Sequence, residues 1–140
     1  MTHRPWTVGL CSLLLLAGCA GSGSAPKTAP VSGKIVLANG EPLTRGIIIF
    51  HPKDPPGNEA RAFVGKDGSF KLSTFLQEDG AVPGHYVVTV EPIANQAPGG
   101  QVKVEGSEAR IPKRYWSEEK SPLKVEIKAG ENTLDPFRLQ

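Results

Sequence analysis

Apolar side chains recur at every second position through most of the chain after residue 30. In residues 31–37 the positions that share one side are Val31, Gly33, Ile35 and Leu37. A period of two indicates half-buried strands, because successive side chains of a strand point to opposite faces. Similar spacing is found in residues 60–64, 69–73, 84–90, 101–105, 123–127 and 133–139.

Residues 47–51, IIIFH, form a continuous apolar run that predicts a central strand covered on both faces. Residues 60–64 and 69–73 flank a turn at Asp67 and Gly68, and they predict a hairpin with Phe70 and Leu72 facing inward. The alternation in residues 84–90 points Tyr86, Val88 and Val90 the same way.

No segment of ten or more residues has a helical period, and the chain contains 16 glycines and 13 prolines. Asn39-Gly40 is a turn signal after the first strand, and Pro136 restricts the last strand to an edge or a bulge. The sequence therefore predicts an all-β fold: a single antiparallel β-sandwich of seven or eight strands over residues 31–140.

The first thirty residues have a different composition. Residues 1–18 carry one cation, Arg4, and an apolar run from Val8 to Ala17, which is typical of a secretory signal peptide and too short to cross a bilayer. Residues 20–30, AGSGSAPKTAP, contain no large apolar side chain. We expect residues 1–18 to be removed on export and residues 19–30 to form a flexible tether of at most ~36–40 Å.

Charge and candidate chemistry add little to this description. Without residues 1–18, which hold Arg4 and no acid, 15 basic and 14 acidic residues remain, so nucleic-acid binding is not expected. Cys11 lies in the signal peptide, which leaves Cys19 without a disulfide partner. The histidines have no metal-ligand spacing, and we expect His51 and His85 to be exposed strand ends.

The serines lie in no Gly-x-Ser-x-Gly turn, and the paired acids Glu78-Asp79 and Glu118-Glu119 are expected to be solvated loop charges. The chain is therefore predicted to have no catalytic residue, no metal and no cofactor, and not to be an enzyme.

Residues 16–19, Leu-Ala-Gly-Cys, resemble the lipobox of bacterial lipoproteins at all four positions. The resemblance implies that the sulfur of Cys19 carries diacylglycerol, that cleavage precedes this residue, and that the new amino terminus is acylated. It also implies a protein anchored on the cell membrane or the outer membrane, with its domain in the periplasm or at the cell surface. The alternatives are a plain signal peptide and a poorly ordered N-terminal segment.

The motifs VSGKIVLANGEPL, KDGSF and PGHYVV occur in that order and resemble the carboxypeptidase regulatory-like domain, a transthyretin-like sandwich. The resemblance extends over residues 31–92, and residues 111–139 are similar to the tails of small lipoproteins with this domain. Gly65 stands where the family often has an acid. The implied function is a non-catalytic accessory, structural or protein-interaction module of the envelope; the alternative is a carbohydrate-binding module that uses exposed loop aromatics.

The long connection over residues 94–122 contains Arg114, Tyr115 and Trp116. We expect Tyr115 to pack inward, and Trp116 to lie partly exposed beside Arg114 as a contact patch for a ligand or partner. A separate hypothesis joins Lys34 to Asn132 by an isopeptide bond assisted by Glu91, as in some surface adhesins. The alternative, which we prefer, is that Lys34 points into water.

Overall fold

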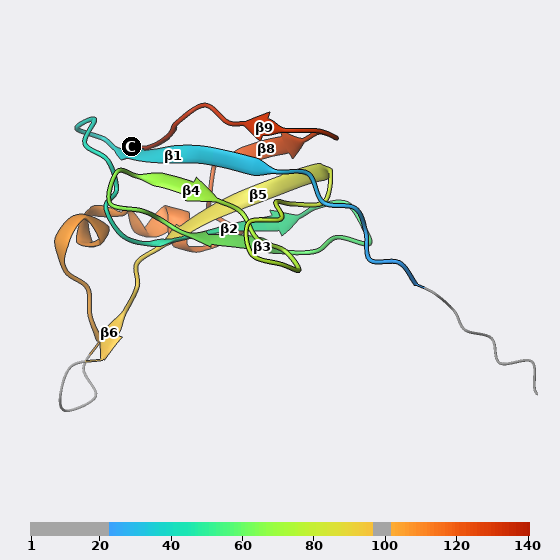
Figure 1. The fold of residues 1–140 in the computed structure, drawn as a ribbon. Coiled ribbons are helices and arrows are strands. Elements are labelled where there is room, and N and C mark those ends of the chain that lie inside the picture. The colour runs from blue at the N-terminus through green and yellow to red at the C-terminus, as the bar shows by residue number, and fades with distance from the viewer. Residues whose placement is uncertain (1–22, 97–101) are drawn as a thin grey trace, which may run out of the picture.

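The described part of the chain forms two four-stranded β-sheets, a two-stranded ribbon and two short helical turns. A computed structural model describes residues 23–96 and 102–140 (Figure 1). The first sheet has the strand order β10-β1-β4, with β9 also paired to β1, and the second has the order β3-β2-β5-β8. The strands of the first sheet are β10 (Phe137–Leu139), β1 (Val31–Leu37), β4 (Ser69–Lys71) and β9 (Asn132–Thr133). Those of the second are β3 (Ala60–Phe63), β2 (Ile47–Pro52), β5 (Gly84–Glu91) and β8 (Lys124–Ile127).

The long connection is more regular than the sequence indicates. It contains the paired strands β6 (Asn95–Gln96) and β7 (Val102–Lys103) and the 3-10 helices η1 (Gly106–Arg110) and η2 (Lys113–Trp116). Helix η2 lies against β5. Within residues 23–96 and 102–140, neither of these helices has the length and apolar character that crossing a membrane requires.

The all-β character and the two layered sheets are confirmed, but the purely antiparallel arrangement is wrong. Strand β1 pairs in parallel with β10, where Ile35 lies opposite Phe137, and also with β9, where Val31 lies opposite Asn132. The chain reaches β9 from β8, an edge strand of the other sheet, so it arrives beside β1 from another layer instead of folding back from β1 itself. Pro136 precedes the edge strand β10, as expected.

Strand β2 is central, between β3 and β5, but only one of its faces is fully buried. Ile48 and Phe50 are inaccessible to solvent, whereas Ile47, Ile49 and His51 on the opposite face are half-buried. The segment with η2 packs against β5, and over β2 it approaches His51 through Glu118, while Ile47 and Ile49 keep part of their surface in solvent. The expectation of cover on both faces is thus wrong.

The expected hairpin between residues 60–64 and 69–73 forms only in part: the Gly65 N–H donates to the Ser69 carbonyl oxygen across the turn at 2.8 Å, but β3 and β4 have their main partners elsewhere. Strand β3 pairs with β2 and strand β4 pairs with β1, so the intervening turn carries the chain from one sheet to the other. One backbone bridge, between Arg61 and Ser73, links the two segments. The turn itself is tight: Gly68 has φ +81°, and a Cβ there would lie 2.6 Å from the Ile35 carbonyl oxygen. Phe70 and Leu72 are buried, as expected.

Four aromatic rings connect the two sheets. The Phe50 ring of β2 lies 6.2 Å from that of Phe70 on β4 and 6.2 Å from that of Phe137 on β10, measured between centroids. Tyr86 of β5 packs 5.8 Å from Phe50 on the same sheet. These tilted and edge-on contacts add to the hydrophobic stabilisation of the buried rings. Phe50 is therefore the residue on which contact between the layers is centred.

Replacing Phe50 with Ala is expected to lower the free energy of unfolding by about 3–5 kcal/mol, because it leaves a cavity between the sheets. Phe63, which is 74% exposed, provides the matched control, and its replacement with Ala is expected to change that free energy by less than about 0.5 kcal/mol. Urea unfolding followed by circular dichroism measures both. Equal losses for the two variants would contradict the placement of Phe50 at the centre of the core.

Candidate functional site

The expected contact patch lies on η2, which is a 3-10 helix and not the extended segment on which the prediction was based. Tyr115 is 3% exposed, as expected, and its hydroxyl accepts a hydrogen bond from the backbone N–H of Gln140 at 3.0 Å. The guanidinium of exposed Arg114 lies over the Tyr115 ring, 5.3 Å from its centroid. Trp116 is half-buried and packs against the core. A role of Arg114 and Trp116 in binding stays a prediction.

The lipidation residue, Cys19, lies outside the residues that the structure describes, as does the signal peptide. The tether is described from Gly23, and residues 23–28 form no helix or strand. Ala29 is buried and is the first residue of the hydrophobic core. The domain therefore begins at Ala29, two residues before residue 31, where the sequence predicts its start.

The geometry does not support the isopeptide hypothesis. The side-chain amide of Asn132 donates to the carbonyl oxygens of Lys128 and Gly130, at 2.8 and 2.9 Å. Glu91 ends β5 in the other sheet, while Lys34 is exposed on β1. The acid is therefore not placed between the two partners, and Lys34 points into water, as preferred.

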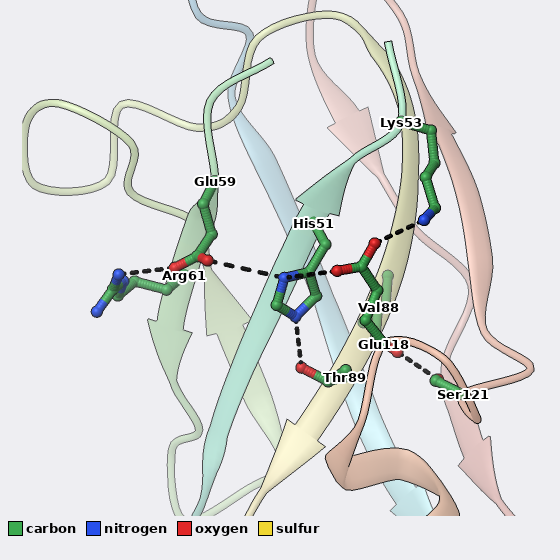
Figure 2. Close-up of polar contacts among 8 residues, drawn as sticks. All are labelled: His51, Lys53, Glu59, Arg61, Val88, Thr89, Glu118 and Ser121. Carbon is green, nitrogen blue, oxygen red and sulfur yellow. Dashed lines mark hydrogen bonds and ion pairs between the residues drawn. The ribbon is translucent and has the colours of Figure 1, made fainter. Parts of the chain in front are cut away.

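A polar cluster around His51 is the main feature that sequence analysis missed. Figure 2 shows the His51 ring between the side chains of Thr89, Glu59 and Glu118. Its Nε2 lies 2.9 Å from the hydroxyl of Thr89 on β5, and its Nδ1 lies 3.7 Å from a carboxylate oxygen of Glu59 and 3.8 Å from one of Glu118. The His51 side chain is only 20% exposed, so the expectation of an exposed strand end is wrong for this residue.

Each carboxylate of the cluster also contacts a cation. Glu118 accepts a hydrogen bond from Lys53 at 2.6 Å, and Glu59 accepts one from Arg61 at 2.6 Å (Figure 2). The hydrogen bond from Lys53, helped to a lesser extent by the positive charge of this side chain, holds the pKa of Glu118 below its usual range despite the opposing effect of desolvation. Glu118 is therefore part of an ion-pair network and not a free loop charge.

The hydroxyl groups near this cluster are poorly placed for nucleophilic chemistry. Thr89 is 1% exposed, and its hydroxyl is already in contact with His51. Ser121 is buried as well, and its hydroxyl donates to the Val88 carbonyl oxygen (Figure 2). Across the two described ranges, no group of three or more acidic, histidine or cysteine side chains is arranged to hold a metal ion. The geometry of the cluster fits the docking of the 117–123 segment onto β5.

Alternation along the strands could have indicated this cluster. His51 shares a face with Ile47 and Ile49, and Thr89 occupies the opposite face of β5 from Val88 and Val90. The positions of Glu59 and Glu118 depend on loop conformation, which carries no periodic signal.

The second histidine, His85, forms an ion pair at the start of β5. One carboxylate oxygen of Asp54 accepts hydrogen bonds from the backbone N–H and the ring Nδ1 of His85, at 2.9 and 2.8 Å. The side-chain hydrogen bond to Asp54 and the charge of that carboxylate raise the pKa of His85, while the backbone and side-chain hydrogen bonds from His85 lower the pKa of Asp54. This pair holds the loop after β2 against the start of β5.

A groove of about 760 Å³ is lined by residues of β2, β3 and β4, by Glu91 at the end of β5, and by residues of the loop after β4, including Gln77 and Glu78. Half-buried Ile47 and Ile49 and exposed Phe63 contribute apolar surface to its lining. Arg61 and Glu91 contribute charge to the same lining. A mixed surface of this type is suited to contact with a protein segment.

No protein-family model matches the chain, and no related sequence is found among curated proteins. Two solved structures have a partial likeness to it. A 9R-lipoxygenase from Cyanothece PCC8801 is 8% identical with a TM-score of 0.44; the alignment covers 82% of this chain but only 17% of the lipoxygenase. A dioxygenase domain of a dioxygenase carbohydrate-binding protein fusion from Streptomyces sp. SirexAA-E is 22% identical with a TM-score of 0.37, over 85% of this chain and 83% of the domain.

Titration of His85 followed by NMR is expected to give a pKa above the ~6.5 of an unperturbed histidine. The ion pair of protonated His85 with Asp54 stabilises the fold fully at a pH below the unperturbed pKa of histidine. This stabilisation is lost as the pH rises through the raised pKa of His85 in the folded state. Replacing Asp54 with Asn is expected to return the pKa toward the ordinary value and to flatten this part of the stability profile. The variant His51→Gln lacks the NMR signal of His51 and so distinguishes it from the signal of His85. An unchanged His85 pKa in Asp54→Asn would refute the ion pair.

Replacing Tyr115 with Ala is expected to destabilise the fold by about 3–5 kcal/mol, as for other large buried aromatics, and to cost more than Trp116→Ala. Tyr115 is almost wholly buried, whereas Trp116 keeps part of its surface in solvent. Thermal and urea unfolding of the two variants compares them directly. A larger loss for Trp116→Ala would reverse the two assignments.

Proposed function

We propose that the mature protein is a lipid-anchored, non-catalytic module of the bacterial cell envelope, held on its membrane through Cys19. The observation that carries this proposal is the lipobox-like Leu16-Ala17-Gly18-Cys19 followed by a tether without large apolar residues. A chain that ends in two or more acyl groups stays bound to a bilayer, since each buried CH2 contributes ~0.8 kcal/mol. The structure is compatible with this arrangement, because the hydrophobic core starts at Ala29, where the tether ends.

We also propose that the sandwich is a transthyretin-like, carboxypeptidase regulatory-like domain. The motif residues that suggested the family occupy the turns they require. Gly40, in the turn after β1, and Gly68, in the turn before β4, have φ of +84° and +81°. Pro83-Gly84 introduces β5. These turn glycines support the proposal because other residues adopt positive φ at a cost.

The non-catalytic part of the proposal is supported by the His51 cluster. Its carboxylates are engaged by Lys53 and Arg61, and its hydroxyl group, on Thr89, is buried. A general base or nucleophile needs access to a substrate, which this arrangement does not provide. The cluster is better explained as the contact that fixes the 117–123 segment on the sheet.

A protein partner is favoured over a carbohydrate. At the predicted contact patch, sugar binding would need an exposed ring face, but Tyr115 is buried and Trp116 is half-buried with its indole N–H out of contact with solvent. The groove along β2 and β3 provides a longer apolar surface with charged margins. We therefore propose that the domain acts through contact with another envelope protein.

The anchor is tested by mass spectrometry of the mature N-terminus, purified in detergent from the membranes of the producing bacterium. The expected species begins at Cys19 and carries a diacylglyceryl group on sulfur. Cys19→Ser is the control, since it removes the sulfur that is alkylated and should accumulate as uncleaved precursor. A free Cys19 thiol, or wild-type protein released in soluble form after export, would contradict the proposal.

A further inference from the structure

The loop over residues 73–80, between β4 and β5, exposes two large apolar side chains. Leu76 is 73% exposed and Phe75 is 44% exposed. They are neighbours at the tip of this loop, unlike Phe63, which lies on the edge strand β3. Two adjacent exposed apolar residues at a loop tip carry a cost in water that a contact would remove.

Hydrogen bonds within the loop fix this tip in place. The Asp79 carboxylate accepts hydrogen bonds from the backbone N–H groups of Thr74, Phe75 and Leu76, at 2.7, 3.1 and 3.0 Å. The Thr74 hydroxyl donates to the Gly80 carbonyl oxygen at 2.7 Å and closes the base of the loop. The apolar pair is therefore presented on a preformed turn.

The base of the loop touches the point where the tether enters the domain. Ala29 and Ala81 exchange two backbone hydrogen bonds, of 2.8 and 3.0 Å. Gly80 has φ +91°, and a Cβ on it would lie 1.8 Å from the Ala29 carbonyl oxygen, so only glycine permits this approach. Figure 1 shows the loop after β4 and the segment that leads into β1 at the same end of the molecule.

We propose that Phe75 and Leu76 insert into the interface of the lipid bilayer that holds Cys19. This inference rests on the proposed anchor. Nine residues separate Cys19 from Ala29, so the ten Cα–Cα steps between them span at most ~33–36 Å and the tether keeps the loop close to the bilayer surface. The acids of the loop do not oppose the contact, because Asp79 is bonded to backbone N–H groups and Glu78 is paired with Lys71.

The size of the patch favours a membrane over a protein. A stable protein interface buries ~800 Å² on each partner, far more than two side chains supply. A protein already tethered to the bilayer needs a much smaller buried area, because the tether gives the loop a high effective concentration at the membrane surface. Insertion orients the domain with this end toward the lipid and leaves its other end free.

The test uses the processed, full-length protein purified from membranes and reconstituted into vesicles of phosphatidylethanolamine and phosphatidylglycerol. Leu76→Cys introduces a thiol for the environment-sensitive dye NBD, since lipidation occupies the sulfur of Cys19. Ala38→Cys is the matched control, because Ala38 is exposed at the far end of β1 from Ala29. When an aqueous quencher is added to these vesicles, we expect blue-shifted, quencher-resistant emission from position 76 and unshifted, quenchable emission from position 38.

Vesicle flotation separates the two ways in which the experiment can fail. Protein that does not float with the vesicles refutes the anchor. Protein that floats while positions 76 and 38 emit and quench alike refutes insertion of the loop and leaves the anchor standing. Phe75→Ser in the Leu76→Cys protein is expected to reduce the blue shift, whereas Phe63→Ser is not. A blue shift at position 76 that is seen in native membranes, but not in vesicles that contain no other protein, would show that the loop contacts a protein partner and would overturn the proposal.

Discussion

Contact between the two sheets through aromatic rings is the interaction on which the rest of the structure depends. Phe50 touches Phe70 and Phe137 of the facing sheet, and Tyr86 packs beside it. Backbone hydrogen bonds hold each sheet together, but between the layers the stabilisation comes mainly from buried apolar surface. The mature chain that we propose has only one cysteine, so no internal disulfide can replace this packing. The loops and the junction at Ala29 therefore depend on this core.

The strands were predictable from the sequence where one face of the strand is buried and the other face is exposed to solvent. Alternation located β1 and β5 correctly, and the central position of β2 followed from its apolar run. Pairing partners were not predictable, because the turn at Gly68 closes equally well within a hairpin or between two sheets. The parallel pairing of β10 with β1 leaves no local signal either. The His51 cluster was missed because Glu59 and Glu118 reach it from loops, and loops have no periodic pattern.

Two polar clusters and one apolar loop tip give different parts of the domain surface different properties. The ion pairs around His51 fix the 117–123 segment on β5, and the His85–Asp54 pair fixes the loop after β2. Neither requires a substrate to explain it. The contact of Gly80 with Ala29 joins the loop at residues 73–80 to the tether, which makes the orientation of the domain a property of its fold. An envelope protein oriented in this way would present its β2–β3 groove consistently to its surroundings.

The central claim is that one core, shared by both sheets, also fixes the junction between tether and loop. Native-state hydrogen exchange of the full-length protein tests it most directly. If the core fixes this junction, the amide of Ala81, which bonds to Ala29, opens with a free energy close to that of core amides in β1 and β5. Rapid exchange of the Ala81 amide while the core amides stay protected would contradict this claim. Opening of the two sheets with clearly different free energies would contradict it as well. Either would show that the loop and the tether move independently of the sandwich.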